Sequence, residues 1–386
     1  MTELADPSKL LYKAVTYQTK ATPLALTEES ISLVKANGSY NVSADDILIE
    51  IHSAALNPVD MLWHRASNWM VGSNQKTLGR DYAGVVAKVG ANLSGKYSVG
   101  DKVCGVITED FGIGTVAQYL VLNPTKNPGI VKVPTDVKLS FNELAAWPLV
   151  LNTAYNMLEL HGATKPVGSS SNILIIGGAT ACGQYLIQLA KVAYKVKTIV
   201  TVNSGSADDF VKLLGADYTI DYTKHKNIAG PVAKIVQDEL GGEKFQFDEL
   251  GGEKFQFVFD CVGNSDLFPE MDNILKSKKE GSAVVTIVGN KKADYNTTTF
   301  MNTVSLSLIK TVVKSKLGLG SFTYTISRSG PTAEWCKRAM GLFEEGKIKI
   351  IIDSTYSLED FSKAVDRSTT NRARGKVIIE VKKDQV

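Results

Sequence analysis

The pattern of hydrophobic and polar positions divides this chain into three stretches. The first contains short β-branched runs, such as Ile47 to Ala54 and Gly84 to Val89, with glycine and asparagine between them at short spacing. That pattern predicts a small barrel-like domain of strands. From Leu144 to Leu160 the period becomes helical, and after Gly346 the chain returns to strand character, ending in Lys376 to Val381.

In the middle stretch, strand-like and helix-like segments alternate. The predicted strands are Thr198 to Val202, Tyr218 to Ile220, Phe255 to Asp260 and Ala283 to Val288, and helical segments separate them. This alternation is typical of a parallel, doubly wound α/β sheet.

The chain length and these changes of pattern together predict two domains. We expect residues 1–149 and 349–386 to form the barrel-type domain, and residues 150–348 to form the domain with the parallel sheet. A lid-like segment at about 291–330 is expected as an insertion in the second domain.

The most informative segment is Asn172 to Lys191, in which an apolar run meets a glycine-rich turn and then a helical pattern. A buried strand that turns into a helix N-terminus presents unpaired backbone N–H groups and the positive end of the helix dipole. The segment therefore predicts a pyrophosphate site and a dinucleotide ligand. Thr180 and Ala181 occupy positions where two glycines are usual. Thr180 either obstructs the pyrophosphate or donates its hydroxyl to it.

The second predicted strand bears on the choice of dinucleotide. An NAD-selective fold places an acid at its end, on the ribose 2′-hydroxyl. Here Asn203 to Ser206 contain no acid before Asp208, and Lys212 follows. Small polar groups and a cation suit a 2′-phosphate, so NADP(H) is favoured over NAD(H). A plain helix cap at Ser204 is compatible with the same residues.

Composition and charge exclude several classes of function. The net charge of +3 is nearly balanced and no basic patch is massed, which argues against nucleic-acid binding. Four well-separated cysteines without a CxxC pair give neither a disulfide framework nor a thiolate zinc lobe. No apolar run of about 18 residues is present, and the N-terminal stretch resembles no targeting signal. We therefore expect a cytoplasmic protein.

Two further segments stand out. The sequence DELGGEKFQF occurs at Asp238 to Phe247 and again at Asp248 to Phe257, and we assign no function to this repeat. Thr298 to Leu319 is apolar and bears lysines. It is interpreted as a helix packed on a cleft or dimer edge, or alternatively as an amphipathic helix that contacts a lipid surface.

Several motifs in order along the chain carry a resemblance to a known family. They are AALNPVD at Ala54–Asp60, LGRDYAGVV at Leu78–Val86, VGDKV at Val99–Val103, AAWPLVLNTAY at Ala145–Tyr155, the glycine turn, FVKLLGADYTIDY at Phe210–Tyr222, FDCVGN at Phe259–Asn264 and RGKVIIEV at Arg374–Val381. The chain resembles the medium-chain dehydrogenase/reductase superfamily and its zinc-free quinone oxidoreductase branch. It is similar to the reticulon-interacting mitochondrial oxidoreductases and to a yeast branch found around lipid droplets.

The resemblance implies a fold and a metal content. It implies a GroES-like, β-barrel-type catalytic domain and a Rossmann domain. Zinc members of the superfamily carry Cys and a His-Glu pair where this chain has Asn57 and Arg80-Asp81. An amide and a guanidinium cannot replace thiolate and imidazole on tetrahedral zinc, so we predict no metal. Asp60 and His64, at i and i+4, lack a third ligand.

The resemblance also implies an activity. Without zinc, reduction of a quinone or an α,β-unsaturated carbonyl is easier than oxidation of an alcohol. Negative charge then develops on the conjugated oxygen, which needs a nearby donor in a dry pocket. By family analogy Asn57 is this donor and Asp60 holds its loop, while Trp63, His64 and Tyr82 are weaker candidates for lining the substrate pocket.

The cofactor residues are carried over position by position from the family. Thr153 is expected beside the nicotinamide, and Arg374 to close on a phosphate, with Lys376 and Arg372 as alternatives. The remaining predicted contacts are Gly177, Thr180, Ala181, Cys182 and Gly183 at the turn, Ser204, Lys212 and Tyr222 at the adenosine end, and Val262, Gly263 and Gly289 at neighbouring strand ends.

Alternative functions remain open at this point. The main hypothesis is an NADPH-dependent quinone or enone reductase. The second is a weakly catalytic or non-catalytic NADPH-binding protein at a lipid or membrane surface. An enoyl-thioester reductase is a third, and Leu62 counts against it because some relatives have tyrosine there. The resemblance further implies a homodimer and an association with lipid droplets or mitochondria.

Overall fold

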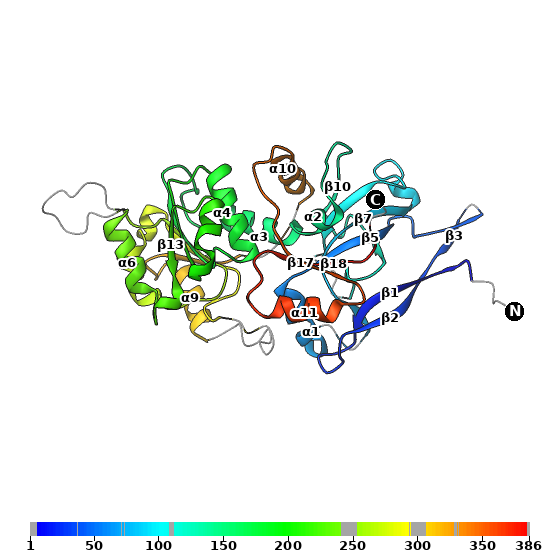
Figure 1. Cartoon of the computed structure of the whole chain (residues 1–386), viewed down its shortest axis with the longest axis horizontal. Coiled ribbons are helices and arrows are strands. Elements are labelled where there is room, and N and C mark those ends of the chain that lie inside the picture. Colours follow the sequence, from blue (N-terminus) through cyan, green and yellow to red (C-terminus); the bar gives the residue numbers. More distant parts are fainter. Residues whose placement is uncertain are drawn as a thin grey trace, which may run out of the picture. The chain divides into compact units, whose positions relative to one another are not determined.

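The protein forms two compact units, each described here by itself. The computed structural model describes residues 6–36, 38–70, 72, 74–107, 112–240, 253–292, 294, 306–327, 330 and 332–383. Described residues of 6–152 and 330–383 belong to the first unit, and those of 153–294 and 306–327 to the second (Figure 1). Within the described part of the chain, no helix is long and apolar enough to cross a membrane.

The first unit is built on a seven-stranded sheet. Its strand path runs β10 (Ile130–Lys132), β8 (Lys102–Val106), β7 (Asp81–Val89), β5 (Ile47–Leu56), β18 (Lys376–Glu380) and β17 (Ile352–Ser357), and β9 (Tyr119–Leu122) pairs with β5. The strand β18 is antiparallel to β5 and parallel to β17, so strands from both ends of the sequence form one sheet.

Smaller elements complete the first unit. A three-stranded sheet contains β2 (Ala25–Ser32), β1 (Lys9–Tyr17) and β6 (Lys76–Thr77), and β3 (Val34–Ala36) pairs with β4 (Ser39–Asn41). The helices are α1 (Pro58–Met70), α2 (Phe141–Ala145), α10 (Ala333–Glu344) and α11 (Phe361–Thr369), with a short helix η1 (Ala91–Leu93). Ile47, Ile49 and Ile51 of β5 are fully buried in one core, because alternate side chains of a strand point to the same face, and Ala54 and Leu56 of the same strand belong to a second core.

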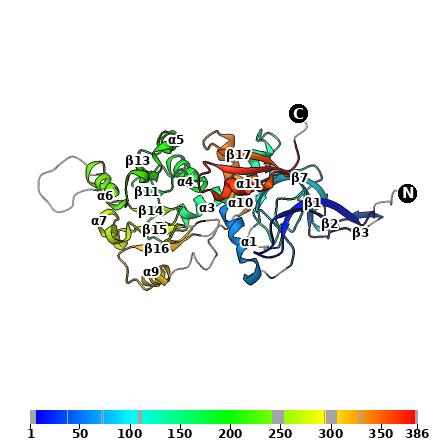
Figure 2. The ribbon, with the colours of Figure 1, turned by 60° about the horizontal axis from the view of Figure 1, so that its bottom comes forward.

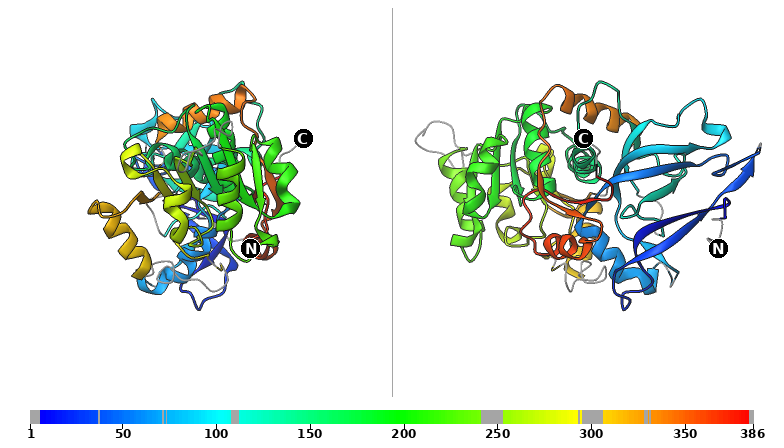
Figure 3. Two further views of the ribbon diagram at one scale, coloured as in Figure 1. Left: turned by 90° about the vertical axis from the view of Figure 1, so that its left-hand side faces the viewer. Right: turned by 45° about the vertical axis from the view of Figure 1, so that its right-hand side comes forward.

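The second unit is a six-stranded parallel sheet. Its order is β13 (Tyr218–Asp221), β12 (Thr198–Asn203), β11 (Asn172–Ile176), β14 (Phe257–Asp260), β15 (Ala283–Thr286) and β16 (Thr323–Ile326). Figure 2 labels all of these strands except β12. All residues of β11, β14 and β15 are buried, because helices cover both faces of the sheet (Figure 3). This order is that of a dinucleotide-binding fold.

The helices of the second unit are mostly short. They are α4 (Ala181–Val192), α5 (Asp208–Leu213), α6 (Ala229–Asp238), α7 (Met271–Ile274) and α9 (Leu306–Lys316), with short turns η2 (Gly205–Ala207), η3 (Tyr222–Lys224), η4 (Phe268–Glu270) and η5 (Lys278–Glu280). Residues of α6, α7 and α9 share one apolar core with β11, β12, β14 and β16.

The expected α/β architecture and the four predicted strands are confirmed, with changes at their ends. The fourth strand stops at Thr286 rather than Val288, because the Thr286 hydroxyl accepts the N–H of Val288 and turns the chain. The helical period from Leu144 to Leu160 belongs to two helices, since α3 (Pro148–Glu159) begins afresh at a proline.

The division into units differs from the expected boundaries in two places. α10 belongs to the first unit, where it packs on β10 and where Phe343 contacts the ring of Trp147. Part of the expected lid is the strand β16, which pairs in parallel with β15 and is therefore a regular member of the sheet. Positions 241–252 of the tandem repeat, and positions 298–305 of the apolar segment, lie outside the described residues.

Candidate functional site

The glycine turn joins β11 to α4 with very little free space. Gly177 has a φ of 88°, and a Cβ atom on it would lie 2.6 Å from Val262 Cγ1. A Cβ on Gly183 would lie 2.2 Å from the carbonyl oxygen of Gly177. Both positions therefore require glycine, and the second allows α4 to approach the end of β11 closely.

Thr180 caps the helix that follows the turn. Its hydroxyl donates to Gly177 O at 2.7 Å and accepts the N–H of Gly183 at 3.1 Å. Thr180 therefore uses its hydroxyl within the turn, which replaces a glycine by an N-cap. The N–H groups of Ala181 and Cys182 lie in the first helical turn, where no intrahelical acceptor exists, so this end of α4 suits an anion.

The end of β14 lies against this turn. The Asp260 carboxylate accepts the backbone N–H groups of Val262, Gly263 and Asn264 at 2.9, 2.9 and 2.7 Å. Burial raises the pKa of Asp260 to about 6, and the three N–H donors oppose that rise. Asp260 thus holds the loop that carries Val262 and Gly263, and the structure brings Val262 beside Gly177, whereas Gly263 lies against the backbone of Lys291.

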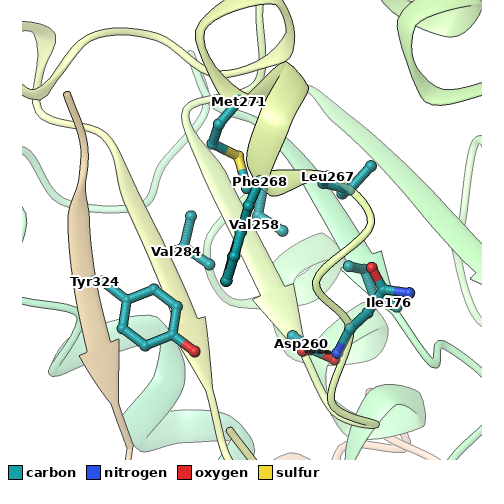
Figure 4. Close-up of a pocket in the computed structure, with 9 residues that line it drawn as sticks. Ile176, Val258, Asp260, Leu267, Phe268, Met271, Val284 and Tyr324 are labelled. Atoms are coloured by element: carbon teal, nitrogen blue, oxygen red, sulfur yellow. Dashed lines mark hydrogen bonds between the residues drawn. The ribbon is translucent and has the colours of Figure 1, made fainter. Parts of the chain in front are cut away.

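A small pocket lies on one face of the sheet beneath Asp260 (Figure 4). It has a volume of about 240 Å³ including its open mouth, and it is lined by Ile176, Val258, Asp260, Asn264, Leu267, Phe268, Met271, Val284 and Tyr324. Burial, followed by the charge of Asp260, raises the pKa of Tyr324. The pocket is smaller than typical ligand sites and mostly apolar, so it is a packing gap beside the dinucleotide turn.

The adenosine end of the predicted site lies where β12 and β13 end. The Ser204 and Ser206 hydroxyls are 3.2 Å apart, and Asn203 donates to Asp208 at 2.7 Å. Lys212 is exposed on α5. Asp221, the last residue of β13, is the N-cap of the short turn η3, which begins at Tyr222.

Sequence analysis missed three charged residues at this end. Asp221 accepts both the N–H and the hydroxyl of Thr223, and these bonds help to lower its pKa to about 2. Lys224 is 3.5 Å from the Asp221 carboxylate. Lys292 Nζ lies 5.8 Å from the centre of the Tyr222 ring. The two lysines follow the strand ends by a few residues, a signal too weak to single them out.

Three other predicted cofactor residues have defined surroundings. Thr153 is 7% exposed in α3. Gly289 follows β15 with a φ of 110°, and its N–H donates to the Thr286 hydroxyl at 3.0 Å. Arg374 lies in the first unit, where its backbone N–H donates to Asp353 at 2.8 Å. The predicted cofactor roles of Thr153, Gly289 and Arg374 stay predictions.

The first unit holds a buried cluster around Asn57, at the end of β5. Asn57 donates through Nδ2 to Asp81 Oδ2 at 2.8 Å. Lys376 Nζ donates to Asn57 Oδ1 at 2.5 Å and to the same Asp81 oxygen at 2.9 Å. The other Asp81 oxygen accepts the N–H of Leu149 at 2.8 Å. We call Asn57, Asp81 and Lys376 the ammonium cluster, and each of its side chains is at most 2% exposed.

Asp60 lies next to this cluster at the start of α1. Asp60 Oδ2 accepts the N–H of Asn57 at 2.7 Å, so Asp60 holds the Asn57 loop as predicted. Asp60 Oδ1 is buried, and the described residues offer it no hydrogen-bond partner. Burial raises the pKa of Asp60 to about 7, although the charges of Arg80 and Lys376 and the Asn57 N–H oppose the rise.

The three weaker pocket candidates have different surroundings. The Arg80 guanidinium lies 5.4 Å from the centre of the Trp63 ring. His64 Nε2 is 3.1 Å from Thr22 O, and burial lowers the pKa of His64, while the hydrogen bond to Thr22 opposes that change. Tyr82 is 1% exposed within the apolar core of the sheet, on the opposite face of β7 from Asp81. Of the three, Trp63 is thus connected with the Asp60 surroundings through Arg80.

The cluster does not fit a zinc ion. Among the described residues, no three His, Cys, Asp or Glu side chains gather closely enough to hold a metal. At Asn57 the available groups are an amide, the carboxylates of Asp81 and Asp60 and the Lys376 ammonium, and a zinc ion requires at least three imidazole, thiolate or carboxylate donors without an adjacent cation.

Together, the six-stranded parallel sheet with its capped turn and the β-rich unit with its buried cluster define a nicotinamide-dinucleotide dehydrogenase or reductase of two units. Comparison with known families agrees. Residues 43–135 match the alcohol dehydrogenase GroES-like domain, and residues 214–379 match the zinc-binding dehydrogenase domain. The chain belongs to the medium-chain dehydrogenase/reductase family.

A curated relative covers nearly the whole chain. Protein YIM1 of Saccharomyces cerevisiae (strain ATCC 204508 / S288c) is 34% identical over 378 residues, which are 96% of this chain and 98% of the yeast protein.

Solved structures share the fold at low identity. The quinone oxidoreductase from Coxiella burnetii has a TM-score of 0.73 at 22% identity and covers 97% of this chain and 100% of its own. The mycobacterial protein Rv1454c complexed with NADPH has a TM-score of 0.66 at 18% identity, with 96% and 100% covered. A putative zinc-dependent alcohol dehydrogenase from Rhizobium etli CFN 42 has a TM-score of 0.70 at 22% identity, with 96% and 98% covered.

Proposed function

We propose that this oxidoreductase uses NADPH to reduce quinones or α,β-unsaturated carbonyls and does so without zinc. The observation that carries the proposal is the ammonium cluster, which offers positive charge and an amide donor but no set of metal ligands. A site of this kind suits a reaction in which negative charge develops on a substrate oxygen.

The residues of the first unit have separate tasks in this reaction. Bound NADPH supplies the hydride. One Nδ2 hydrogen of Asn57 is directed to Asp81, and the other has as its nearest described acceptor Ala55 O at 3.5 Å, the outer limit of a hydrogen bond. This weakly used N–H donates to the developing oxyanion. Asp60 fixes the Asn57 backbone and, with a pKa near neutrality, supplies the proton that the reduced product takes up.

The adenosine end favours a 2′-phosphate. Asn203, at the end of β12, offers an amide where an NAD-selective fold has a carboxylate, and this amide already holds Asp208. The Asp221 carboxylate also lies at the adenosine end, but it accepts the Thr223 hydroxyl and pairs with Lys224. Lys292 and the hydroxyls of Ser204 and Ser206 then supply a cation and donors for a phosphate.

The test is direct turnover by the full chain. Purified protein is mixed with NADPH and a panel of quinones and enones, and oxidation of NADPH is followed with and without a chelator. We expect oxidation above the protein-free rate for at least one acceptor, with the rate unchanged by the chelator. Absence of oxidation with every acceptor would contradict the reductase, and loss of the rate with chelator would contradict zinc independence.

A second candidate function rests on the exposed face of α9, which stands on the outside of the second unit (Figure 3, left). We define the apolar stripe of α9 as Leu306, Ile309, Val313 and Leu317, which are 46–77% exposed. Leu308, on the opposite face, is buried in the core. The spacing of three to four residues puts the stripe on one side of the helix.

The charges beside the apolar stripe are all positive. Lys310, Lys314 and Lys316 flank it, and no acid occurs between Leu306 and Ile326. A helix with apolar residues between lysines suits the surface of an anionic membrane, where the lysines remain at the headgroups. We therefore propose that α9 binds anionic lipid surfaces, which would bring the protein to lipid droplets or mitochondria.

Sedimentation with vesicles tests this second function. We expect binding to phosphatidylserine–phosphatidylcholine vesicles, weakening with salt, and little binding to phosphatidylcholine alone. Ile309→Glu with Val313→Glu should abolish binding, whereas Leu213→Glu, at a still more exposed leucine on α5, should not. Undiminished binding of the double variant would contradict the proposal. A second result would also contradict it: the wild type binds no lipid, and the double variant has half the molecular mass of the wild type in solution. The stripe would then be the contact between two copies of the chain.

A further inference from the structure

Lys376 is a buried lysine whose partners are side chains far away in the sequence. It lies 319 residues from Asn57 and 295 from Asp81, and it reaches both because β18 lies directly beside β5. Burying an ammonium costs several kcal/mol unless its partners compensate for lost hydration. Such a residue is retained either for packing or for what its charge does to its neighbours.

The bonds of Lys376 fix the orientation of the Asn57 amide. Asn57 Oδ1 faces the ammonium and Nδ2 faces the Asp81 carboxylate. A flipped amide would direct two N–H groups at the ammonium and a carbonyl oxygen at the carboxylate, which is unfavourable at both ends. A cation on Oδ1 also withdraws electrons from the amide, so the remaining Nδ2–H becomes a stronger donor.

A second buried lysine in the same unit shows the purely structural alternative. Lys76 is also 2% exposed, but the described acceptors of its Nζ are the backbone carbonyls of Gln18, Gly72 and Asn74, and the centre of the Tyr17 ring lies 6.0 Å away. Its charge therefore acts on main-chain loops. Lys376 instead acts on the side-chain amide of Asn57, which in the proposed reaction donates a hydrogen bond to the oxyanion.

We propose that Lys376 is a positioning residue that takes the place of a metal ion: its ammonium orients and polarises the Asn57 amide towards the substrate oxygen. This inference rests on the proposed reductase function. Unlike a metal, the ammonium is part of the chain and cannot be lost, and its charge is balanced by Asp81 rather than by thiolates.

Kinetics of matched variants separate positioning from packing. Lys376→Met should lower kcat about a hundredfold, as for loss of an oxyanion donor, with KM for NADPH unchanged. Lys376→Arg, which keeps the charge, should restore at least a tenth of the rate. Lys76→Met should lower the melting temperature but leave kcat per folded protein unchanged.

A double variant removes the effect of an unpaired buried charge. Asp81→Asn with Lys376→Met eliminates both members of the ion pair, so the melting temperature should recover relative to Lys376→Met alone. The rate should remain low. Recovery of both the melting temperature and kcat would overturn the inference, because Lys376 would then serve packing alone.

A binding measurement keeps the inference testable if the proposed reaction fails. Ionised para-nitrophenol presents a phenolate oxygen with negative charge, as the substrate does during reduction, and its colour reports ionisation. The wild type should lower the apparent pKa of bound para-nitrophenol by about one, and Lys376→Met should abolish that change. Absence of NADPH oxidation by the wild type would overturn the proposed function alone. Equal para-nitrophenol titrations in the two proteins, or no binding by the wild type, would overturn the role of Lys376.

Discussion

Asp60 Oδ2 accepts the backbone N–H of Asn57 at 2.7 Å, while Oδ1 of the same carboxyl is buried with no hydrogen-bond partner among the described residues. Oδ2 of Asp60 therefore holds the Asn57 loop, and Oδ1 can carry a proton. Because burial raises the pKa of Asp60 to about 7, the carboxyl is partly protonated under neutral conditions. This arrangement links the stability of the first unit to pH.

Replacement of Asp60 should change the pH dependence of unfolding. The folded pKa of about 7 exceeds the unfolded value of about 3.9, so the folded state keeps a proton that the unfolded state releases. The stabilising contribution is complete below pH about 4 and is lost as pH rises to about 7, by about 1.4 kcal/mol per pH unit.

Urea unfolding of the wild type and of Asp60→Asn between pH about 4 and 8 measures this difference. The Asn variant should be the more stable protein at neutral pH and should show the smaller slope. Asp260 adds a slope of the same sign up to pH about 6 in both proteins, so the difference isolates Asp60. Parallel pH curves for the two proteins would show that Asp60 titrates normally.

Alanine at Gly183 should abolish dinucleotide binding. The added Cβ would lie 2.2 Å from Gly177 O and would push α4 away from the end of β11. We expect a lower melting temperature and no thermal shift with NADPH. Gly230→Ala, in α6, is the control, since nothing lies within 4 Å of its added Cβ, and it should stabilise by up to about 1 kcal/mol. A normal NADPH shift for Gly183→Ala would contradict the close approach.

The cap at Thr180 should have a measurable energy. Thr180→Ala removes the acceptor of the Gly183 N–H and should cost about 1 kcal/mol in the free energy of unfolding. Thr180→Ser keeps the hydroxyl and should cost much less. Chemical denaturation of both variants measures the difference, and equal losses would mean that the methyl group, rather than the hydroxyl, matters.

Reversal of charge at Lys292 should discriminate between the two dinucleotides. Lys292 lies over the Tyr222 ring at the adenosine end, so Lys292→Glu should weaken NADPH binding about tenfold, or about 1.4 kcal/mol. NADH binding should change little because it lacks the 2′-phosphate. Lys279→Glu, at an exposed lysine in η5, is the matched control. Equal loss for NADPH and NADH would contradict the 2′-phosphate assignment.

The sequence predicted the second unit well because its signals are local. The run before Gly177, the turn and the helical period of α4 lie within one short segment, and β11 and α4 follow it closely. The cap made by Thr180 was readable in principle, since threonine before a helix is a common N-cap. From the sequence we expected Thr180 either to obstruct the pyrophosphate or to donate its hydroxyl to it, and we did not consider a helix cap.

The cluster of the first unit was only half predictable. Asn57 and Asp60 were singled out from one loop, and the bond between them is local. Lys376 was considered only as an alternative to Arg374 for closing on a phosphate, because a lysine in a strand gives no sign of its partner across the sheet. Its contact with Asn57 depends on the pairing of Val377 with Leu56, a register that neither strand shows alone.

The pairing of β18 with β5 also has a consequence for the newly made chain. Asn57 and Asp81 are synthesised early, but their counter-charge arrives only with residue 376, near the end of translation. Until then the first unit lacks both the strand between β5 and β17 and the cation for Asp81. The second unit, complete by β16, is free to fold first during synthesis, and the first unit is finished last.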